Sequence, residues 1–262
     1  MIDIIIPAYN CSKTLDRTLG SLIGQTDSDF LVTIVDDCST EDVKSIIDDY
    51  ANKLNIVYIR NEKNLGCGMS RQVGIDNTSC KYFCFLDSDD VFMPYTVETF
   101  NATIKVRPDL ELLHTHFYEK IIVNDIPTLM LKKDGYTWCH GKLYNRALVT
   151  KYDIKNDPKV RWADDSFFNS MCTELMKMDI IELPTMIWCN NYDSVTRRRD
   201  SDREKNVIKD FLAALDKSVR LVLRYKDKVE HLEYTIRTLK KQCELDEEEL
   251  AMLNSIIKLT DK

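Results

Sequence analysis

The sequence has no uninterrupted apolar run of the roughly 18 residues that a membrane-spanning helix requires. Its start, MIDIIIPAYN, has no basic region followed by a long apolar stretch, and so does not resemble a secretory signal peptide. The 36 Lys and Arg residues are fewer than the 43 Asp and Glu residues. The formal net charge of −7 argues against a general nucleic-acid binder, because affinity for phosphate backbones needs a basic surface. These absences predict a protein of the cytoplasm.

Cysteine motifs for metal binding or disulfide bonding are also missing. The nine cysteines are scattered, none of them forms a CxxC pair, and their number is odd. We therefore expect reduced thiols that pack as small apolar side chains, in preference to a zinc site or a disulfide framework. Apolar residues still make up 44% of the chain and aromatic residues 9%, which is enough to build a core.

The first hundred residues alternate short apolar runs with amphipathic stretches. The pattern predicts strands at 2–7, 31–35, 56–60 and 82–86, and helices at 12–23, 41–54 and 69–77. Ser12 is the expected cap of the first helix. Strand and helix alternating at this spacing imply right-handed crossovers and a parallel sheet.

Polar clusters follow three of these predicted strands. They are Tyr9-Asn10, Asp36-Asp37 and the acidic group at 87–90. In parallel α/β sheets, ligands bind beyond the carboxyl ends of the strands. The positions of the three clusters therefore indicate one shared binding edge.

The acidic group, Leu86-Asp87-Ser88-Asp89-Asp90, carries the most specific chemistry. Three carboxylates within four residues repel one another, and a cation would offset that repulsion. Oxygen ligands of this kind suit Mg²⁺ or Mn²⁺ bound together with phosphates. A solvated acidic turn or a cluster at a helix start is the alternative interpretation.

Four segments occur in order: IIIPAYN at 4–10, VDDCST at 35–40, NLGCGMSRQVGI at 64–75, and LDSDD. Together they resemble the family 2 glycosyltransferases of GT-A fold, strongly over about 1–100 and more weakly over 135–200. The resemblance implies an α/β, Rossmann-like domain at 1–200 with a mostly parallel central sheet. Its first half, 1–100, would bind the nucleotide, and 101–200 would bind the acceptor and carry out catalysis.

The resemblance also implies roles for single residues. The implied nucleotide-binding residues are Pro7, Tyr9, Asp37, Gly66, Arg71 and Asp87. Pro7 and Tyr9 would line the base pocket, Asp37 would accept the uracil N3–H, and Arg71 would reach the ribose or the diphosphate. In the family's DXD element, Asp89 would coordinate Mn²⁺ or Mg²⁺, with Asp87 on the ribose or a metal-bound water.

A second acidic element, Trp162-Ala163-Asp164-Asp165-Ser166-Phe167-Phe168, stands at a predicted helix start. The two acids could simply favour the helix N-terminus. The segment resembles the family's Glu-Asp element, whose second acid is the catalytic base. Asp165 is therefore the predicted base, and Asp164 stands where relatives carry Glu.

The stretch Cys139-His140-Gly141-Lys142-Leu143-Tyr144-Asn145-Arg146 resembles a loop that flanks the donor sugar in relatives. Trp138, His140 and Asp164 are accordingly candidates for contact with the donor or acceptor sugar. A structural histidine is the alternative for His140. Some relatives carry a metal-binding histidine in a closing loop, which 191–199 resembles, but no histidine lies between His140 and His231. A third protein ligand for the metal is therefore not identified.

The predicted function is transfer of a hexose from a UDP-sugar, such as UDP-glucose, to a hydroxyl of an unidentified acceptor. Asp165 would take the proton and the anomeric configuration would invert in one displacement. Two alternative functions make other demands on the sequence. A nucleotidyltransferase would need a glycine-rich, basic phosphate loop near the N-terminus, which this chain lacks. An inactive scaffold protein that assembles through its helical tail predicts loss of the acids, yet Asp37, Asp89 and Asp165 are present.

The tail at 201–262 has no proline or glycine and is predicted to be a helical extension. Apolar residues recur at alternating steps of three and four from Ile208 to Cys243, as in a heptad seam. A second helix is expected after Asp246, burying Leu250, Leu253 and Ile257. The seam supports two main interpretations, packing on the chain's own domain or a homo-oligomer formed through 207–244. Binding to a membrane surface is a third, which the mixture of acids and bases on the polar face disfavours.

Overall fold

The computed structural model describes residues 1–133, 138–160, 164–189, 204–226 and 247–260 of this chain. The described elements, in chain order, are β1 (Ile2–Ala8), α1 (Leu15–Ile23), β2 (Phe30–Asp36), α2 (Val43–Asp48), β3 (Ile56–Arg60), α3 (Cys67–Asn77), β4 (Tyr82–Phe85), β5 (Val91–Phe92), α4 (Thr96–Val106), β6 (Leu112–Val123), β7 (Ile126–Lys132), β8 (Lys142–Asn145), α5 (Arg146–Lys151), α6 (Asp164–Leu175), β9 (Met178–Cys189), α7 (Glu204–Val222) and α9 (Glu247–Thr260).

One sheet organises the molecule, with the strands in the order β3-β2-β1-β4-β8-β6-β9-β5 and β7 paired beside β6. The pairings among β3, β2, β1 and β4 are all parallel, as the sequence predicts. Beyond β4 the sheet is mixed, because β8 runs antiparallel to both of its neighbours and β5 runs antiparallel to β9. The predicted α/β class is confirmed, and the parallel arrangement belongs to the first half.

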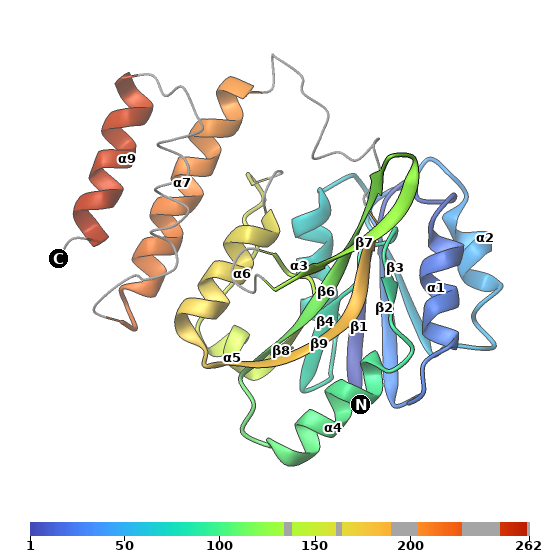
Figure 1. Ribbon diagram of the computed structural model, residues 1–262. Helices are drawn as coiled ribbons and strands as arrows, with labels where there is room; N and C mark the ends of the chain where they lie inside the picture. Colours follow the sequence, from blue (N-terminus) through green and yellow to red (C-terminus); the bar gives the residue numbers. More distant parts are fainter. Residues whose placement is uncertain (134–137, 161–163, 190–203, 227–246, 261–262) are drawn as a thin grey trace.

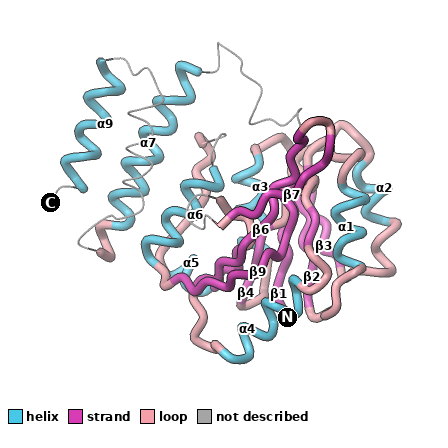
Figure 2. Tube along the Cα trace, in the orientation of Figure 1, coloured by secondary structure: helices cyan, strands magenta, loops and turns pink. Residues whose placement is uncertain are grey.

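Helices cover both faces of this sheet (Figures 1 and 2). Successive side chains of a strand point to opposite faces, and the buried residues follow that alternation. Ile4, Ile6 and Cys84 pack in the core with α1, α2 and α4. Ile5 and Phe85 pack in the opposite core with α3 and α6. A strand buried on both faces needs a nearly continuous apolar run, which explains the composition of β1 and β4.

Helix boundaries in the first half differ from the prediction at capping positions. The first helix begins at Leu15 after Thr14, and not at Ser12. The Ser12 hydroxyl instead donates to Glu41 Oε2 at 2.6 Å, which ties the loop after β1 to the loop after β2. The helix predicted at 41–54 ends at Asp48, and turns continue to Leu54. Helix α3 begins at Cys67, two residues earlier than predicted.

Strands β7, β8 and β9 of the second half were not predicted from the sequence. β6 and β7 form a hairpin, in which Asn124 and Asp125 adopt φ values of 50° and 62°. Two consecutive left-handed residues are typical of a type I′ turn, and Asn and Asp tolerate that conformation better than most residues. The stretch predicted as a loop at 139–146 contains the strand β8, and β9 supplies a long neighbour for β6.

The helical tail folds back on the domain in the part that the structure describes. Leu212, Leu215, Val219 and Val222 of α7 are fully buried, in the same core cluster as α6 and α9. Figure 1 shows α7 lying between α6 and α9. The apolar residues in the described part of the seam therefore pack against other elements of the same chain. The prediction that 207–244 joins two chains remains untested for 227–246, which lies outside the described residues.

Two details of the tail prediction were wrong. The seam predicted a continuous helix from Ile208 to Cys243, but α7 ends at Val222 and turn residues follow. In α9, Leu250 is 45% exposed, and Ile256 is buried together with Leu253. The helical period fixes which residues share a face, but it does not fix the rotation of a helix against its neighbour. None of the described helices is both long and apolar enough to cross a lipid bilayer.

Burial of α7 gives a testable prediction. Leu215→Ala should lower the free energy of unfolding by about 2–5 kcal/mol, because it leaves a cavity in a packed core. Leu250→Ala is the matched control and should change it by no more than about 0.5 kcal/mol, since Leu250 is largely exposed. Urea denaturation measures both. Equal effects would contradict the observed packing of the tail.

Candidate functional site

The site begins where β1 and β2 end side by side. The Asn10 side-chain oxygen accepts bonds from the backbone N–H groups of Thr40 at 2.8 Å and Glu41 at 3.3 Å, so the two loops are joined. Tyr9 is 47% exposed, whereas Pro7 is buried within β1. Of the two residues predicted to line a base pocket, Tyr9 alone offers an exposed surface, here an aromatic ring.

The two acids after β2 have separate tasks. Asp36 is fully buried and accepts bonds from Ser39 N at 2.8 Å and the Tyr58 hydroxyl at 2.7 Å, and it also pairs with Arg60. Burial alone would raise the pKa of Asp36, but the hydrogen bonds from Ser39 and Tyr58 hold it below its ordinary value. Asp36 therefore stabilises the end of β2.

Asp37 organises the loop that leads into α3. Its carboxylate accepts from Asn61 Nδ2, Leu65 N and Gly66 N, each at 2.8 Å. Gly66 has φ of 91° and ψ of 161°, a conformation that residues with a Cβ rarely adopt. A glycine is needed here so that the chain can enter α3 while its N–H reaches Asp37.

Arg71 and Asp87 form the centre of the site. Arg71 lies on α3, only 5% exposed, and its NH2 atom donates to Asp87 Oδ1 at 2.6 Å. The guanidinium also lies over the Phe85 ring, 5.6 Å from its centroid. Arg71, predicted at the ribose or diphosphate, and Asp87, predicted at the ribose or a metal-bound water, are thus brought together from separate elements. Helix α3, which carries Arg71, packs on β1 and β2.

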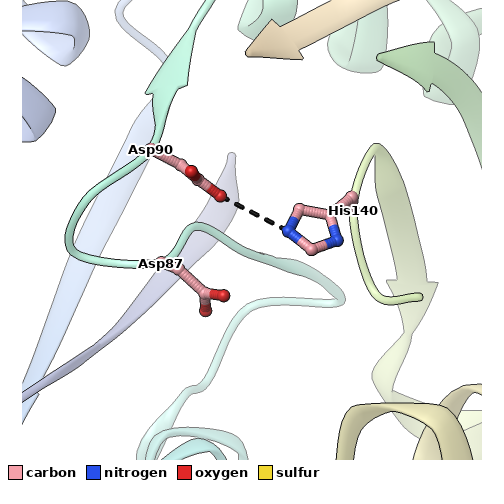
Figure 3. A group of neighbouring side chains, drawn as sticks. All are labelled: Asp87, Asp90 and His140. Atoms are coloured by element: carbon pink, nitrogen blue, oxygen red, sulfur yellow. Dashed lines mark ion pairs between the residues drawn. The ribbon is translucent and has the colours of Figure 1, made fainter. Parts of the chain in front are cut away.

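Asp87, Asp90 and His140 form a compact group, shown in Figure 3. One potential ligand atom from each residue lies within 4.8 Å of the others. His140 Nε2 is 3.4 Å from Asp90 Oδ2. The two acids come from the loop after β4, and His140 comes from the segment before β8 (Figure 3). Because β4 and β8 are neighbours in the sheet, the fold brings these residues together across about 50 positions of sequence.

Within this group Asp90 is the most deeply buried. Its side chain is fully buried and Oδ1 accepts from Cys189 N at 2.7 Å. Asp89, the metal ligand predicted from the sequence, lies outside the group of three. Its backbone oxygen accepts from Arg17 NH2 at 2.5 Å. Among the described residues the structure thus groups Asp87 with Asp90 and His140.

Electrostatics couple the members of this group. Burial alone would raise the pKa of Asp87, but the guanidinium of Arg71 and then His140 hold it below its ordinary value. Burial raises the pKa of Asp90 despite the opposing effect of His140. Burial would lower the pKa of His140, yet the nearby carboxylates of Asp90, Asp87 and Asp165 raise it. The site therefore concentrates negative charge that a cation or a protonated imidazole offsets.

An aromatic frame holds His140. Its ring stacks on Phe117 with centroids 5.3 Å apart and lies 5.4 Å from the Trp188 ring. Trp138 packs against Trp188 at 5.9 Å, and both indoles are partly exposed. The prediction that Trp138 and His140 share one site is consistent with this geometry. Phe117 and Trp188 were missed, because strands β6 and β9, which carry them, were not paired from the sequence.

Gly141 allows His140 to hold its position. Gly141 has φ of +64°, and a Cβ built on it would lie 2.5 Å from the Thr115 backbone oxygen. Its own carbonyl accepts from Thr115 N at 2.7 Å. Glycine at this position therefore lets the backbone of the His140 segment approach β6 closely.

Asp165 lies at the start of α6 beside the same group. Its backbone oxygen is within 3.5 Å of Cys139 Sγ, and its Oδ1 accepts from Ser166 N at 2.8 Å. This hydrogen bond is of the kind expected for an acid at a helix N-terminus. It uses only one of the two carboxylate oxygens of Asp165. Burial raises the pKa of Cys139 to about 12, so this thiol stays protonated and is no nucleophile.

A small pocket lies at the centre, lined by Arg71, Phe85, Asp87, Cys139 and His140. The roles predicted for the Asp164 side chain and for the closing loop at 191–199 lie outside the described residues. The structure thus brings Arg71, Asp87 and His140 together around one pocket, with the predicted base Asp165 near His140.

Comparison with known proteins agrees with this arrangement. The family model described as glycosyl transferase family 2 matches residues 3–162, more than half of the chain. The chain belongs to this family. The matched region of the family 2 chain covers the loops after β1, β2 and β4 and the His140 segment, and it ends three residues before Asp165.

Curated relatives of the family 2 chain include named glycosyltransferases. It is 29% identical over 180 residues to the poly(ribitol-phosphate) beta-N-acetylglucosaminyltransferase TarS of Staphylococcus aureus, covering 63% of this chain and 31% of TarS. It is 33% identical over 151 residues to chondroitin synthase of Escherichia coli, covering 57% of this chain and 21% of that enzyme. The chain thus spans less than a third of the length of either relative.

Solved structures show the same fold. Staphylococcus aureus TarS 1–349 in complex with UDP-GlcNAc has a TM-score of 0.78 and 20% identity, covering 99% of this chain and 81% of that one. The mannosyltransferase PcManGT of Pyrobaculum calidifontis, in complex with GDP-Man and Mn²⁺, has a TM-score of 0.58 and 13% identity, covering 100% of this chain and 80% of that one. At these identities the likeness establishes the family 2 chain's fold alone, which confirms the expected GT-A architecture.

Proposed function

We propose that this chain transfers a hexose or an N-acetylhexosamine from a UDP-sugar to a hydroxyl of an acceptor. One observation carries the proposal: Arg71, Asp87 and His140 come from three segments and line one pocket at the carboxyl end of the sheet, and Asp165 lies close enough to His140 to raise its pKa. A ligand bound there would contact a cation, a guanidinium and a carboxylate base together. The UDP-GlcNAc complex of TarS supports the choice of donor class.

The nucleotide would lie along the ends of β1 and β2. The exposed ring of Tyr9 gives a stacking face for the base. Asp37 already accepts three hydrogen bonds, and a carboxylate has about four acceptor positions, so room remains for one uracil N–H. Arg71 would contact the diphosphate or ribose from α3. Asp87, paired with Arg71, would sit at the ribose.

The residues present also fit a divalent cation. Asp90 Oδ2 and both ring nitrogens of His140 are buried without a hydrogen-bond partner among the described residues. Buried polar atoms of this kind are uncommon, and a cation would satisfy them. We propose Mn²⁺ or Mg²⁺ at the acidic group after β4. When bound, it would offset the charge that develops on the leaving diphosphate.

Asp165 would act as the general base. It would accept the proton of the acceptor hydroxyl while that oxygen attacks the anomeric carbon, and the bond to the diphosphate would break on the opposite face. A single displacement of this kind inverts the anomeric configuration. The partly exposed indoles of Trp138 and Trp188 offer apolar faces on which a sugar ring could rest.

Calorimetry with a panel of nucleotides tests the donor assignment. UDP and at least one UDP-hexose should bind with Mn²⁺ present, and CDP should bind at least about tenfold more weakly because cytosine has no N3–H for Asp37 to accept. Arg71→Ala should weaken UDP binding, and Arg107→Ala, an arginine remote from the pocket, serves as the control. Absence of UDP binding by the folded protein, with and without Mn²⁺, would refute the proposed function.

A further inference from the structure

The strongest remaining feature of the site is the position of His140. The sequence provides acids for a cation but no histidine in the closing segment, and so leaves a third protein ligand unidentified. In the structure, His140 lies in the segment just before β8 and faces the acids of the loop after β4. We propose that His140 and Asp90, together with Asp87, ligate the catalytic cation in this chain. The imidazole would make the site favour Mn²⁺ over Mg²⁺.

The spacing of the three side chains suits one ion. Mg²⁺ binds oxygen at about 2.0–2.1 Å, so ligands at right angles lie about 3 Å apart and opposite ligands about 4.2 Å apart. His140 Nε2 and Asp90 Oδ2 are separated by 3.4 Å, and all three ligand atoms lie within 4.8 Å of one another. Side-chain shifts of about 1 Å or less would place all three in contact with an ion of this size.

Burial and bonding distinguish this group from a solvated acidic turn. The side chain of Asp90 is fully buried and that of His140 is 10% exposed. Asp90 Oδ2 and His140 Nε2 face each other, yet among the described residues neither has a partner with hydrogen-bond geometry. A histidine with a purely structural role ordinarily has at least one ring nitrogen satisfied. Figure 3 shows these two atoms facing each other as an ion pair, with Asp87 beside them as a third potential ligand.

The neighbours of His140 also fix its orientation. Phe117 stacks against one face of the ring, and Trp188 lies 5.4 Å away. The bond from Cys189 N to Asp90 Oδ1 leaves Oδ2 directed at the imidazole. Ligands held in this way lose little conformational freedom when an ion binds.

The ligand set determines the preferred ion. Carboxylates suit both Mg²⁺ and Mn²⁺, but imidazole nitrogen favours transition-metal ions, whereas Mg²⁺ keeps oxygen ligands. A site with His140 should therefore bind Mn²⁺ more tightly than Mg²⁺. These residues would hold the cation that the proposed function requires, so the catalytic role of the ion rests on that function.

Direct measurement of Mn²⁺ binding tests the inference without reference to catalysis. Electron spin echo spectroscopy of the Mn²⁺-loaded full chain should show modulation from an imidazole ¹⁴N nucleus. His140→Ala should abolish that modulation and weaken Mn²⁺ at least about tenfold in calorimetry, since loss of even an outer-shell partner costs about 10–100-fold. Asp90→Asn should weaken Mn²⁺ binding to a similar extent.

His116→Ala is the matched control, because it removes another buried imidazole from the same sheet, outside the group of three. It should retain the ¹⁴N modulation. If His140→Ala does not fold, His140→Gln, which keeps much of the side-chain volume, is measured instead. Unchanged Mn²⁺ affinity and modulation in a folded His140 variant would overturn the inference. UDP binding in chelator is recorded separately, so failure of the proposed function is distinguishable from failure of the ligand assignment.

Discussion

Asp165→Asn is expected to lower the rate of sugar transfer by about 10²–10⁴-fold, the usual contribution of a general base. The amide keeps the size of the side chain and can still accept the bond from Ser166 N at its oxygen, so α6 should begin as before. It cannot take a proton from the acceptor hydroxyl. The substitution therefore removes the proposed chemical role and leaves the helix start in place.

Donor affinity is the informative second measurement for this variant. UDP-sugar binding by calorimetry should stay within about threefold of the wild-type value, because the proposed nucleotide contacts come from β1, β2 and α3. This range corresponds to roughly 0.65 kcal/mol. Asp109→Asn, an exposed acid remote from the pocket, should leave both transfer and binding unchanged. Wild-type turnover in Asp165→Asn would remove Asp165 from the mechanism.

Removal of divalent cations should reduce transfer by about 10²–10⁴-fold, which corresponds to the several kcal/mol of charge stabilisation that a bound metal supplies. The acidic group explains the expected effect, since Asp87 is ionised next to the buried Asp90 and the departing diphosphate adds further negative charge. Dialysis against chelator followed by an assay for UDP release measures the loss.

Re-addition of ions supplies the control for chelation. Mn²⁺ should restore transfer at a lower concentration than Mg²⁺. Without an added ion the rate should stay low, because the positive charge of the Arg71 side chain does not replace the ion. Thermal unfolding recorded in chelator should show that the fold persists, because the cores on both faces of the sheet are apolar. Full transfer in excess chelator would contradict a metal role and leave Arg71 as the principal positive charge at the site.

Local sequence patterns were sufficient for the first half of the fold. β1 and β4 are nearly continuous apolar runs because both of their faces are buried, and such runs are visible without knowledge of their partners. The order of strand and helix then fixes a parallel arrangement with polar loops at one edge. Asp37, Arg71 and Asp87 could be predicted for this reason, together with family segments whose residues lie close in sequence.

Patterns were less informative where structure depends on contacts between distant segments. β7 is exposed along nearly its whole length, and β8 has only four residues, so neither shows a strong period. The pairing of β8 between β4 and β6 involves residues far apart in the chain. A short strand of this kind is stabilised by its neighbours in the sheet, and its own residues give little sign of it.

The sequence by itself determined the family, the sheet edge that carries the site, and the residue types available for chemistry there. Tertiary structure alone decided which of the clustered acids face one another, that His140 joins them, and that the described seam of α7 packs on the chain's own domain. The physical reason is the same in each case. Periodicity and residue type specify which face a side chain occupies, whereas the direction in which it points depends on backbone turns and on neighbours brought in by the fold.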